Sequence, residues 1–262
     1  MKKIKAVVLR AAGVNCNKET VVALELAGAY RVDEMHINLL KKNKKLFDKY
    51  HIMVIPGGFT YGDYVGAGKI LANEIKFILF EQIKKFVKQG KIIIGICNGF
   101  QVLVKSGLLT IDEKNYTQTF SLIENDSRRF ECRWVYLRIN QNSIFFRHLP
   151  DIIYLPVAHN EGKFVAQRPE DIEKLKSTNR IGVKYCTPDG DTMNVKYPFN
   201  PNGAESNIAG IINSAGNVLG LMPHPERFIL PQQHPYFYYL NYNNKKISPF
   251  GLQIFKNAVN SV

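Results

Sequence analysis

The sequence predicts an α/β fold, with a mostly parallel central sheet flanked by helices and an additional β-rich section. In the first half, short apolar segments alternate with amphipathic segments of helical spacing, as in sheets covered by helices. The apolar segments are hydrophobic throughout, which is typical of parallel strands buried on both faces. From about Thr117 the pattern becomes more strand-like. No internal repeat is evident, and we expect one domain over residues 1–262.

The first half gives its elements in a regular order. We expect a strand at 6–9, a helix at 19–27, a strand at 51–55, one long or two shorter helices at 70–88, and a strand at 91–96 that leads into a helix. In such a sheet the working loops follow the carboxyl ends of the strands. Both Gly58 and Cys97 lie at such positions.

The second half contains strands of a different kind. Segment 130–139 alternates as a half-exposed strand does, and turn residues at 188–190 and 200–203 separate further short strands. The remaining elements expected here are a strand at 152–157, a last apolar strand at 218–222 and a final helix at 251–259. A tail at 232–249, rich in Tyr, Asn and Pro, precedes that helix.

Composition and charge exclude several classes of protein. The 262 residues are 45% hydrophobic and 22% charged, as in ordinary globular proteins. No run of about eighteen apolar residues is present, so we expect no membrane span and a cytoplasmic protein. The net charge of +13 comes from dispersed lysine clusters. These lack the interleaved basic and aromatic residues of a single-strand groove, so we expect no nucleic-acid partner.

The cysteines are expected to be free thiols. The chain has four, with no short-spaced pair, which argues against a disulfide framework and against a zinc site. We therefore expect no metal site. Core positions are expected for Cys132 and Cys186, and a loop position for Cys16.

Cys97 differs from the other cysteines because it lies between two glycines in the segment 95–99, where an apolar strand ends and a helix begins. This arrangement is typical of a nucleophile elbow, a strained turn that presents one reactive side chain. Glycines are expected on both sides because a Cβ there would clash. The helix N-terminus favours thiolate over thiol. The sequence therefore predicts Cys97 as a catalytic nucleophile.

A cysteine nucleophile needs a base, and the base needs an orienting group. Of the six histidines, His224 stands apart because it follows an apolar strand, lies between two prolines and precedes Glu226 by two residues. Extended backbone would point both side chains to the same side. We predict a triad in which Glu226 orients His224 and His224 takes the proton of Cys97. His159, which also follows a strand, is the weaker alternative.

Acyl transfer also needs hydrogen-bond donors for an oxyanion. The backbone N–H of Asn98, directly after the nucleophile, is the expected first donor. The loop after strand 51–55 is the expected source of the second, with Gly58 preferred and Phe59 as the alternative. The alternative interpretation is that this loop has no catalytic role and is only a turn that ends the strand.

No phosphate loop is visible in the chain. The glycine-rich stretch 61–70 contains Gly68-Lys69, but its glycine spacing is wrong for a Walker loop, and Ile70 replaces the needed Ser or Thr. The dinucleotide fingerprint is missing as well. We therefore expect no ATP, NAD or other cofactor in this chain.

The motifs resemble those of class I (triad) glutamine amidotransferases, which have a flavodoxin-like fold. Segments 95–101 and 222–227 carry this general resemblance. More narrowly, the chain resembles the PurQ family, the glutaminase subunits of phosphoribosylformylglycinamidine synthase. Phe100-Gln101 and segment 129–134 carry the narrower resemblance, with support from 56–63, 158–162 and 200–203.

The resemblance implies a reaction and partners. Cys97 would attack the side-chain amide of L-glutamine, giving a γ-glutamyl thioester and ammonia, and water activated by His224 would release glutamate. Phe59 and Gln101 would line the glutamine pocket, with the backbone of 125–127 near the amino-acid end of the substrate. A synthetase subunit, PurL, often with the small PurS, would bind ATP, Mg and formylglycinamide ribonucleotide, and use the ammonia in purine biosynthesis.

Two positions depart from the family pattern, since Asn17 stands where Asp is common and Asn160 where Gly is common. The roles of His159 and Glu161 therefore stay open, and we expect Glu161 to pair with a lysine rather than hold substrate. Two other functions also stay open. One is a cysteine hydrolase of peptides or γ-glutamyl compounds that needs no synthetase, and the other is a non-catalytic or nucleic-acid-associated basic protein with the same fold.

Overall fold

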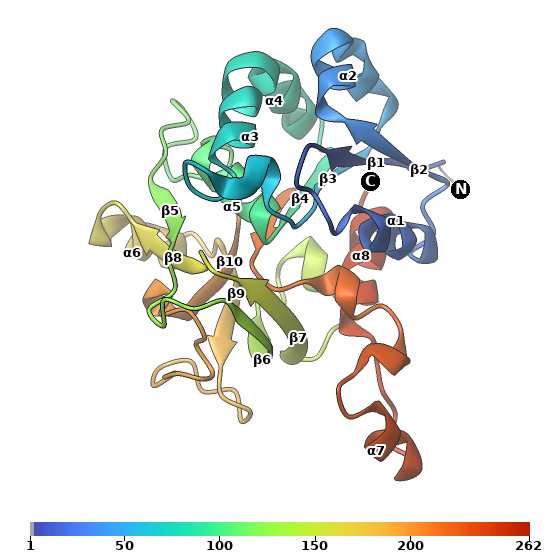
Figure 1. The fold of residues 1–262 in the computed structure, drawn as a ribbon, viewed down its shortest axis with the longest axis vertical. Helices are drawn as coiled ribbons and strands as arrows, with labels where there is room; N and C mark the ends of the chain where they lie inside the picture. Colours follow the sequence, from blue (N-terminus) through green and yellow to red (C-terminus); the bar gives the residue numbers. More distant parts are fainter. Residues whose placement is uncertain (1–2) are drawn as a thin grey trace.

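A nine-stranded sheet in the order β2-β1-β3-β4-β11-β10-β9-β6-β7 runs through the protein (Figure 1). The computed structural model describes residues 3–262. The strands are β1 (Lys5–Arg10), β2 (Arg31–His36), β3 (Ile52–Ile55), β4 (Ile92–Ile96), β6 (Glu131–Ile139), β7 (Ile152–His159), β9 (Ile181–Cys186), β10 (Ile208–Ile212) and β11 (Val218–Leu221).

The first five strands of this order form the parallel half of the sheet. Strands β2, β1, β3, β4 and β11 pair in parallel throughout. Every residue of β3, β4 and β11 is buried, as their continuous apolar sequences require. The predicted α/β fold class is confirmed, and the expected strands at 6–9, 51–55, 91–96 and 218–222 lie within two residues of those observed.

The β-rich section extends the same sheet with antiparallel strands. Strands β10, β9, β6 and β7 each pair antiparallel with the preceding strand of the order. In β6, Val135, Leu137 and Ile139 point into the core, while Cys132 has the opposite parity and is exposed. The expected core position of Cys132 was therefore wrong, whereas that of Cys186, which is buried, is confirmed.

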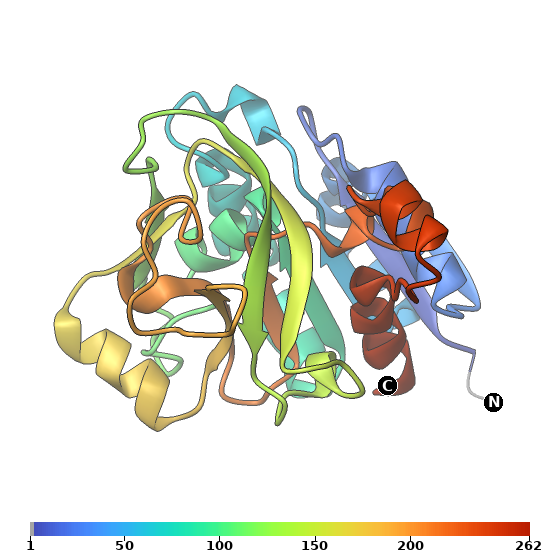
Figure 2. The same cartoon turned by 90° about the horizontal axis from the view of Figure 1, so that it is seen from below.

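Helices cover both faces of the parallel half. The helices are α1 (Asn17–Leu26), α2 (Ile37–Lys42), α3 (Lys69–Glu74), α4 (Phe80–Lys88), α5 (Asn98–Lys105), α6 (Pro169–Ser177), α7 (Phe237–Tyr242) and α8 (Phe250–Asn260). Helix α1 packs against α8, and α3 packs against α5 (Figures 1 and 2). A π-helical segment, Ile75–Leu79, joins α3 to α4, so the expected stretch 70–88 is one interrupted helix.

Two parts of the chain stand outside this frame. Strands β5 (Phe120–Ile123) and β8 (Lys163–Ala166) form a small antiparallel pair. The segment that carries α7 projects from the body at the lower right of Figure 1, with Tyr238 and Tyr242 strongly exposed. Within residues 3–262, no helix has both the length and the apolar character needed to cross a membrane.

The sheet order brings three chain segments to one edge. Strand β4 lies between β3 and β11, and all three are parallel, so their carboxyl ends meet. Gly58 follows β3, Cys97 follows β4 and His224 follows β11. Residues that are distant in sequence therefore converge where α/β sheets bind their ligands.

Candidate active site

Cys97 occupies a strained turn between β4 and α5. Its backbone has φ 50° and ψ −104°, and its N–H donates to the carbonyl of Leu221 on β11 at 2.8 Å. A Cβ on Gly99 would lie 1.8 Å from the carbonyl oxygen of Ile55, and one on Gly95 would lie 2.6 Å from that of Gly99. The elbow geometry and the need for flanking glycines are confirmed, and they hold the thiol at the start of α5.

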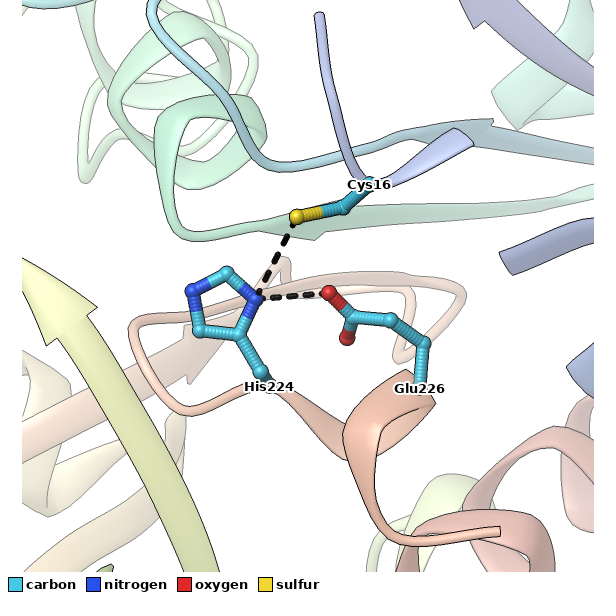
Figure 3. A group of neighbouring side chains, drawn as sticks. All are labelled: Cys16, His224 and Glu226. Atoms are coloured by element: carbon cyan, nitrogen blue, oxygen red, sulfur yellow. Dashed lines mark hydrogen bonds and ion pairs between the residues drawn. The ribbon is translucent and has the colours of Figure 1, made fainter. Parts of the chain in front are cut away.

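His224 and Glu226 form a buried pair beside the elbow. The Nδ1 atom of His224 lies 2.6 Å from Oε1 of Glu226, and both side chains are almost inaccessible to solvent. Figure 3 shows the carboxylate meeting the imidazole on that nitrogen. The backbone N–H of His224 donates to Pro156 at 2.8 Å, which anchors the turn to β7. The Nε2 atom has no hydrogen-bond partner within the described chain.

The charges around His224 favour its protonated form. Burial opposes an imidazolium, but the charge of Glu226, followed by interactions with Cys97 and Cys16, outweighs burial and raises the pKa of His224 well above its ordinary value. The Cys97 thiol donates to the carbonyl of Ala158 on β7 at 3.5 Å, and its interaction with His224 is electrostatic. The structure thus brings the three residues of the predicted triad to the same edge of the sheet, with Glu226 in contact with His224.

Cys16 is an unexpected member of this cluster. It is buried, it directly precedes α1, and its Sγ lies 4.0 Å from Nδ1 of His224 (Figure 3). The expected loop position is confirmed, and the thiol is buried beside His224 because the turn before α1 packs over the loop that follows β3. Cys16, His224 and Glu226 include the donor types that a metal ion would use. However, the His224–Glu226 hydrogen bond already uses Nδ1, and Arg227 donates to the sulfur at 3.2 Å.

The loop after β3 presents a backbone donor beside Cys97. Gly58 has φ 149°, and a Cβ there would lie 2.6 Å from the carbonyl oxygen of Gly13, so only glycine fits. The Phe59 N–H donates to that same carbonyl at 2.9 Å, which removes Phe59 as an alternative donor. The N–H groups of Gly58 and Asn98 make no hydrogen bond to residues 3–262, so both are available to an oxyanion.

The side chains of Asn98 and Gln101 belong to a polar network below the site. Asn98 Nδ2 donates to Gln101 Oε1 at 2.9 Å, and Gln101 Nε2 donates to the carbonyl of Glu161 at 2.6 Å. Thr60 donates its hydroxyl to Asn98 Oδ1 at 2.7 Å. The network ties α5 to the loops after β3 and β7, so it sets the shape of the site.

A cavity of about 190 Å³ opens at Cys97. This is smaller than the roughly 300–1,000 Å³ of pockets that hold drug-sized ligands, and it suits an amino-acid side chain. Its lining includes Gly58, Phe59, Cys97, Gln101, His159 and Glu161. The predicted lining by Phe59 and Gln101 therefore agrees with the structure. A larger cavity of about 500 Å³, over β6 and β9, contains none of the predicted site residues.

Most of the remaining candidate groups are bonded to other parts of the protein. Glu161 accepts from the N–H of Ala67 at 3.1 Å and lies 3.7 Å from the ammonium of Lys105, so the expected lysine pair is present. The backbone N–H groups of Asn125 and Asp126, expected near the amino-acid end of the substrate, donate instead to carbonyls within the protein. The Ser127 hydroxyl is buried without a partner in the described chain.

His159 is held as a neutral imidazole at the edge of the cavity. Burial, and then the charge of His224, lower the pKa of His159 to about 3. Asn125 Oδ1 lies 3.1 Å from its Nδ1 and also accepts the N–H of Gly162, so Nδ1 carries the proton. A histidine held neutral in this way is a poor general base and a good acceptor at Nε2.

His159 should make folding sensitive to acid. An unfolded histidine takes up a proton near pH 6.5, whereas folded His159 does not until about pH 3. The unfolded state therefore binds more protons in this window, and stability falls as pH drops, by up to about 1.4 kcal/mol per pH unit. We expect His159→Gln to flatten the pH dependence of the unfolding free energy between about pH 6.5 and 4.5. Denaturant titrations of both proteins would test this, and equal slopes would contradict it.

Comparisons with known proteins place this site in a family context. The model of the CobB/CobQ-like glutamine amidotransferase domain family matches residues 3–262. The chain is 46% identical to phosphoribosylformylglycinamidine synthase subunit PurQ of Dehalococcoides mccartyi, over 99% of this chain and 98% of the relative. It is 41% identical to the PurQ subunit of Methanococcus maripaludis strain C7, over 97% and 96%.

The fold agrees with solved structures as well. The chain is similar to a chain in the structure of PurLQS from Thermotoga maritima, with a TM-score of 0.73, 30% identity and 99% coverage of both chains. It also shares its fold with the glutaminase domain of CTPS from Trypanosoma brucei, at a TM-score of 0.57 and 13% identity. Relatives with these names match nearly the whole chain, so the resemblance is not confined to the motifs around the cysteine.

Proposed function

The chain belongs to the CobB/CobQ-like glutamine amidotransferase family, and on this premise we propose that it is the glutaminase subunit of a phosphoribosylformylglycinamidine synthase. One observation carries the proposal: a strained cysteine elbow beside a buried histidine–glutamate pair, at a cavity of amino-acid size. The substrate is L-glutamine, and the products are glutamate and ammonia.

The first half-reaction forms a thioester. The sulfur of Cys97 attacks the carboxamide carbon of glutamine, and the thiol proton passes to His224. The negative charge that develops on the amide oxygen is stabilised by the N–H groups of Gly58 and Asn98. His224, oriented by Glu226, then gives its proton to the leaving nitrogen. The carbon–nitrogen bond breaks, ammonia leaves, and a γ-glutamyl thioester remains on Cys97.

The second half-reaction restores the enzyme. Ammonia has taken a proton from His224, so the imidazole is again a base and removes a proton from water. The hydroxide adds to the thioester carbon, and the same two N–H groups stabilise the second oxyanion. The carbon–sulfur bond breaks, glutamate leaves, and the proton returns to Cys97. The nearly enclosed triad limits the access of other water to the intermediate.

The partner of this subunit is a synthetase of the PurL type, with a small PurS protein. Support comes from the PurQ names of the relatives and from the PurLQS structure, whose similar chain covers 99% of this one. ATP and Mg act on the synthetase, where formylglycinamide ribonucleotide receives the ammonia to give formylglycinamidine ribonucleotide. This division of labour fits a chain that has no phosphate-loop motif. The enzyme acts in the cytoplasm and binds neither nucleic acid nor membrane.

A glutamine analogue that carries a chloromethyl ketone in place of the carboxamide tests the site. We expect one adduct per chain, located on Cys97 by peptide mapping, because the analogue places its carbon where the nucleophile attacks. Excess glutamine should slow the labelling. Cys132, which is exposed, serves as an internal control for non-specific alkylation. An adduct on Cys16 or Cys132 that glutamine prevents, with none on Cys97, would overturn the assignment.

A further inference from the structure

The sulfur of Cys16 lies against the same ring nitrogen that holds the catalytic carboxylate. Its Sγ lies 4.0 Å from Nδ1 of His224, and Oε1 of Glu226 lies 2.6 Å from that nitrogen (Figure 3). All three side chains are buried. Cys16 comes from the turn before α1, whereas the other two follow β11. In the proposed mechanism, His224 and Glu226 have defined roles and Cys16 has none.

The sulfur of Cys16 accepts a hydrogen bond from the guanidinium of Arg227. Arg227 Nη2 donates to Sγ at 3.2 Å, and the thiol donates to Asn15 Oδ1 at 3.1 Å. Sulfur is a weak acceptor, so a guanidinium with five N–H donors would bind a carboxylate more strongly if one were in reach. The Arg227 hydrogen bond to Cys16 is therefore the weaker of the two that this side chain could make.

A carboxylate oxygen is available close by. Glu226 directly precedes Arg227, and its Oε2 is buried without a hydrogen-bond partner in the described chain. The charge of Arg227 acts on Glu226. A buried carboxylate oxygen without a partner costs free energy, so an arginine freed from its present contact would be drawn to it. An ion pair between Arg227 and Glu226 would then compete with the hydrogen bond from His224 to Glu226.

We propose that Cys16 is a positioning residue for the triad: its sulfur holds the Arg227 guanidinium out of hydrogen-bond contact with Glu226, so that the carboxylate bonds to His224 and not to Arg227. This inference rests on the proposed function, because it concerns His224 as the base. Without the sulfur, Arg227 turns to Oε2 and neutralises the carboxylate. His224 then loses basicity toward the Cys97 thiol, although no atom of the triad has been removed.

Five variants test this arrangement. We expect Cys16→Ala to lower kcat for glutamine hydrolysis about tenfold with little change in KM, because base strength falls while the cavity stays intact. Cys16→Ser keeps a side-chain acceptor for Arg227 and should recover most of that loss. Combining Cys16→Ala with Arg227→Met should restore kcat to that of Arg227→Met alone, since the intruding cation is gone. Cys186→Ala is the matched control, a buried thiol on β9.

A second readout separates this inference from the proposed function. The rate at which iodoacetamide alkylates Cys97, followed by peptide mapping, depends on His224 but needs no glutamine turnover. We expect Cys16→Ala to slow this alkylation at pH 6 to 7, and Cys186→Ala to leave it unchanged. Failure of the wild-type subunit to hydrolyse glutamine when assembled with its synthetase partner would remove the proposed function, while the alkylation comparison would still test Cys16. Unchanged kcat and alkylation in Cys16→Ala, or multiplied losses in the double variant, would overturn the inference.

Discussion

Cys97→Ala should abolish glutamine-dependent amination by the assembled synthase, with a loss of about 10⁴-fold or more. The alanine removes the only atom that forms a bond to the substrate carbon, and the remaining donors cannot replace a nucleophile. Ammonia supplied in solution should still support amination, because the synthetase reaction does not involve this cysteine. The variant should fold normally, since alanine is smaller than cysteine and the strained turn is kept by Gly95 and Gly99.

The measurement compares product formation with glutamine and with ammonium salt, using the synthetase partner and either form of this subunit. Cys186→Ala, which changes a buried thiol on β9, a strand separated from β4 by β11 and β10, should leave both rates unchanged. Glutamine-dependent synthesis that survives Cys97→Ala would show that another residue is the nucleophile. Loss of both rates would instead indicate that the subunits no longer assemble.

Glu226→Gln should lower kcat by about 10²–10⁴-fold with little effect on KM. Gln keeps the size of the side chain but carries no charge, and its NH₂ group can point at Nδ1 and select the wrong tautomer of His224. In wild type, the carboxylate accepts from Nδ1 at 2.6 Å inside a site with almost no solvent. The charge that stabilises the imidazolium would be gone, while glutamine would meet the same cavity walls.

Steady-state kinetics of glutamine hydrolysis at several pH values would check this expectation. Glu173→Gln, which changes an exposed carboxylate on α6, controls for the loss of one negative charge. A Glu226→Gln enzyme within about threefold of the wild-type kcat would mean that Glu226 only supports the turn. A raised KM with normal kcat would place Glu226 in substrate binding.

The parts of the fold that sequence predicted well are those with a strong local pattern. Strands β1, β3 and β4 are apolar along their length because helices cover both faces, so each stands out in the sequence. Strand β2 was missed because it is an edge strand in which only Met35 is buried. Helix α6 was also missed, although Pro169 at its start and acidic residues in its first turn are recognised helix signals.

In the candidate site, too, residues in short local motifs could be predicted and residues that depend on tertiary contacts could not. The location of Cys97, His224 and Glu226 at one edge of the sheet could be predicted because each belongs to a short motif directly after a strand. Cys16 could not, because its contact with His224 joins residues 208 positions apart and has no pattern of its own. Whether Gly58 or Phe59 supplies the second oxyanion donor could not be predicted either. It depends on a tertiary contact, namely which of the two N–H groups donates to the carbonyl of Gly13.

The pairing of β4 with β11 has a consequence for protein synthesis. A chain that is still on the ribosome carries Cys97 long before His224, because the whole β-rich section separates the two strands. Until β11 docks beside β4, the thiol has no base and cannot release ammonia. On the proposed mechanism, ammonia production therefore waits for the last strand of the described chain, and a half-finished subunit is expected to hydrolyse no glutamine.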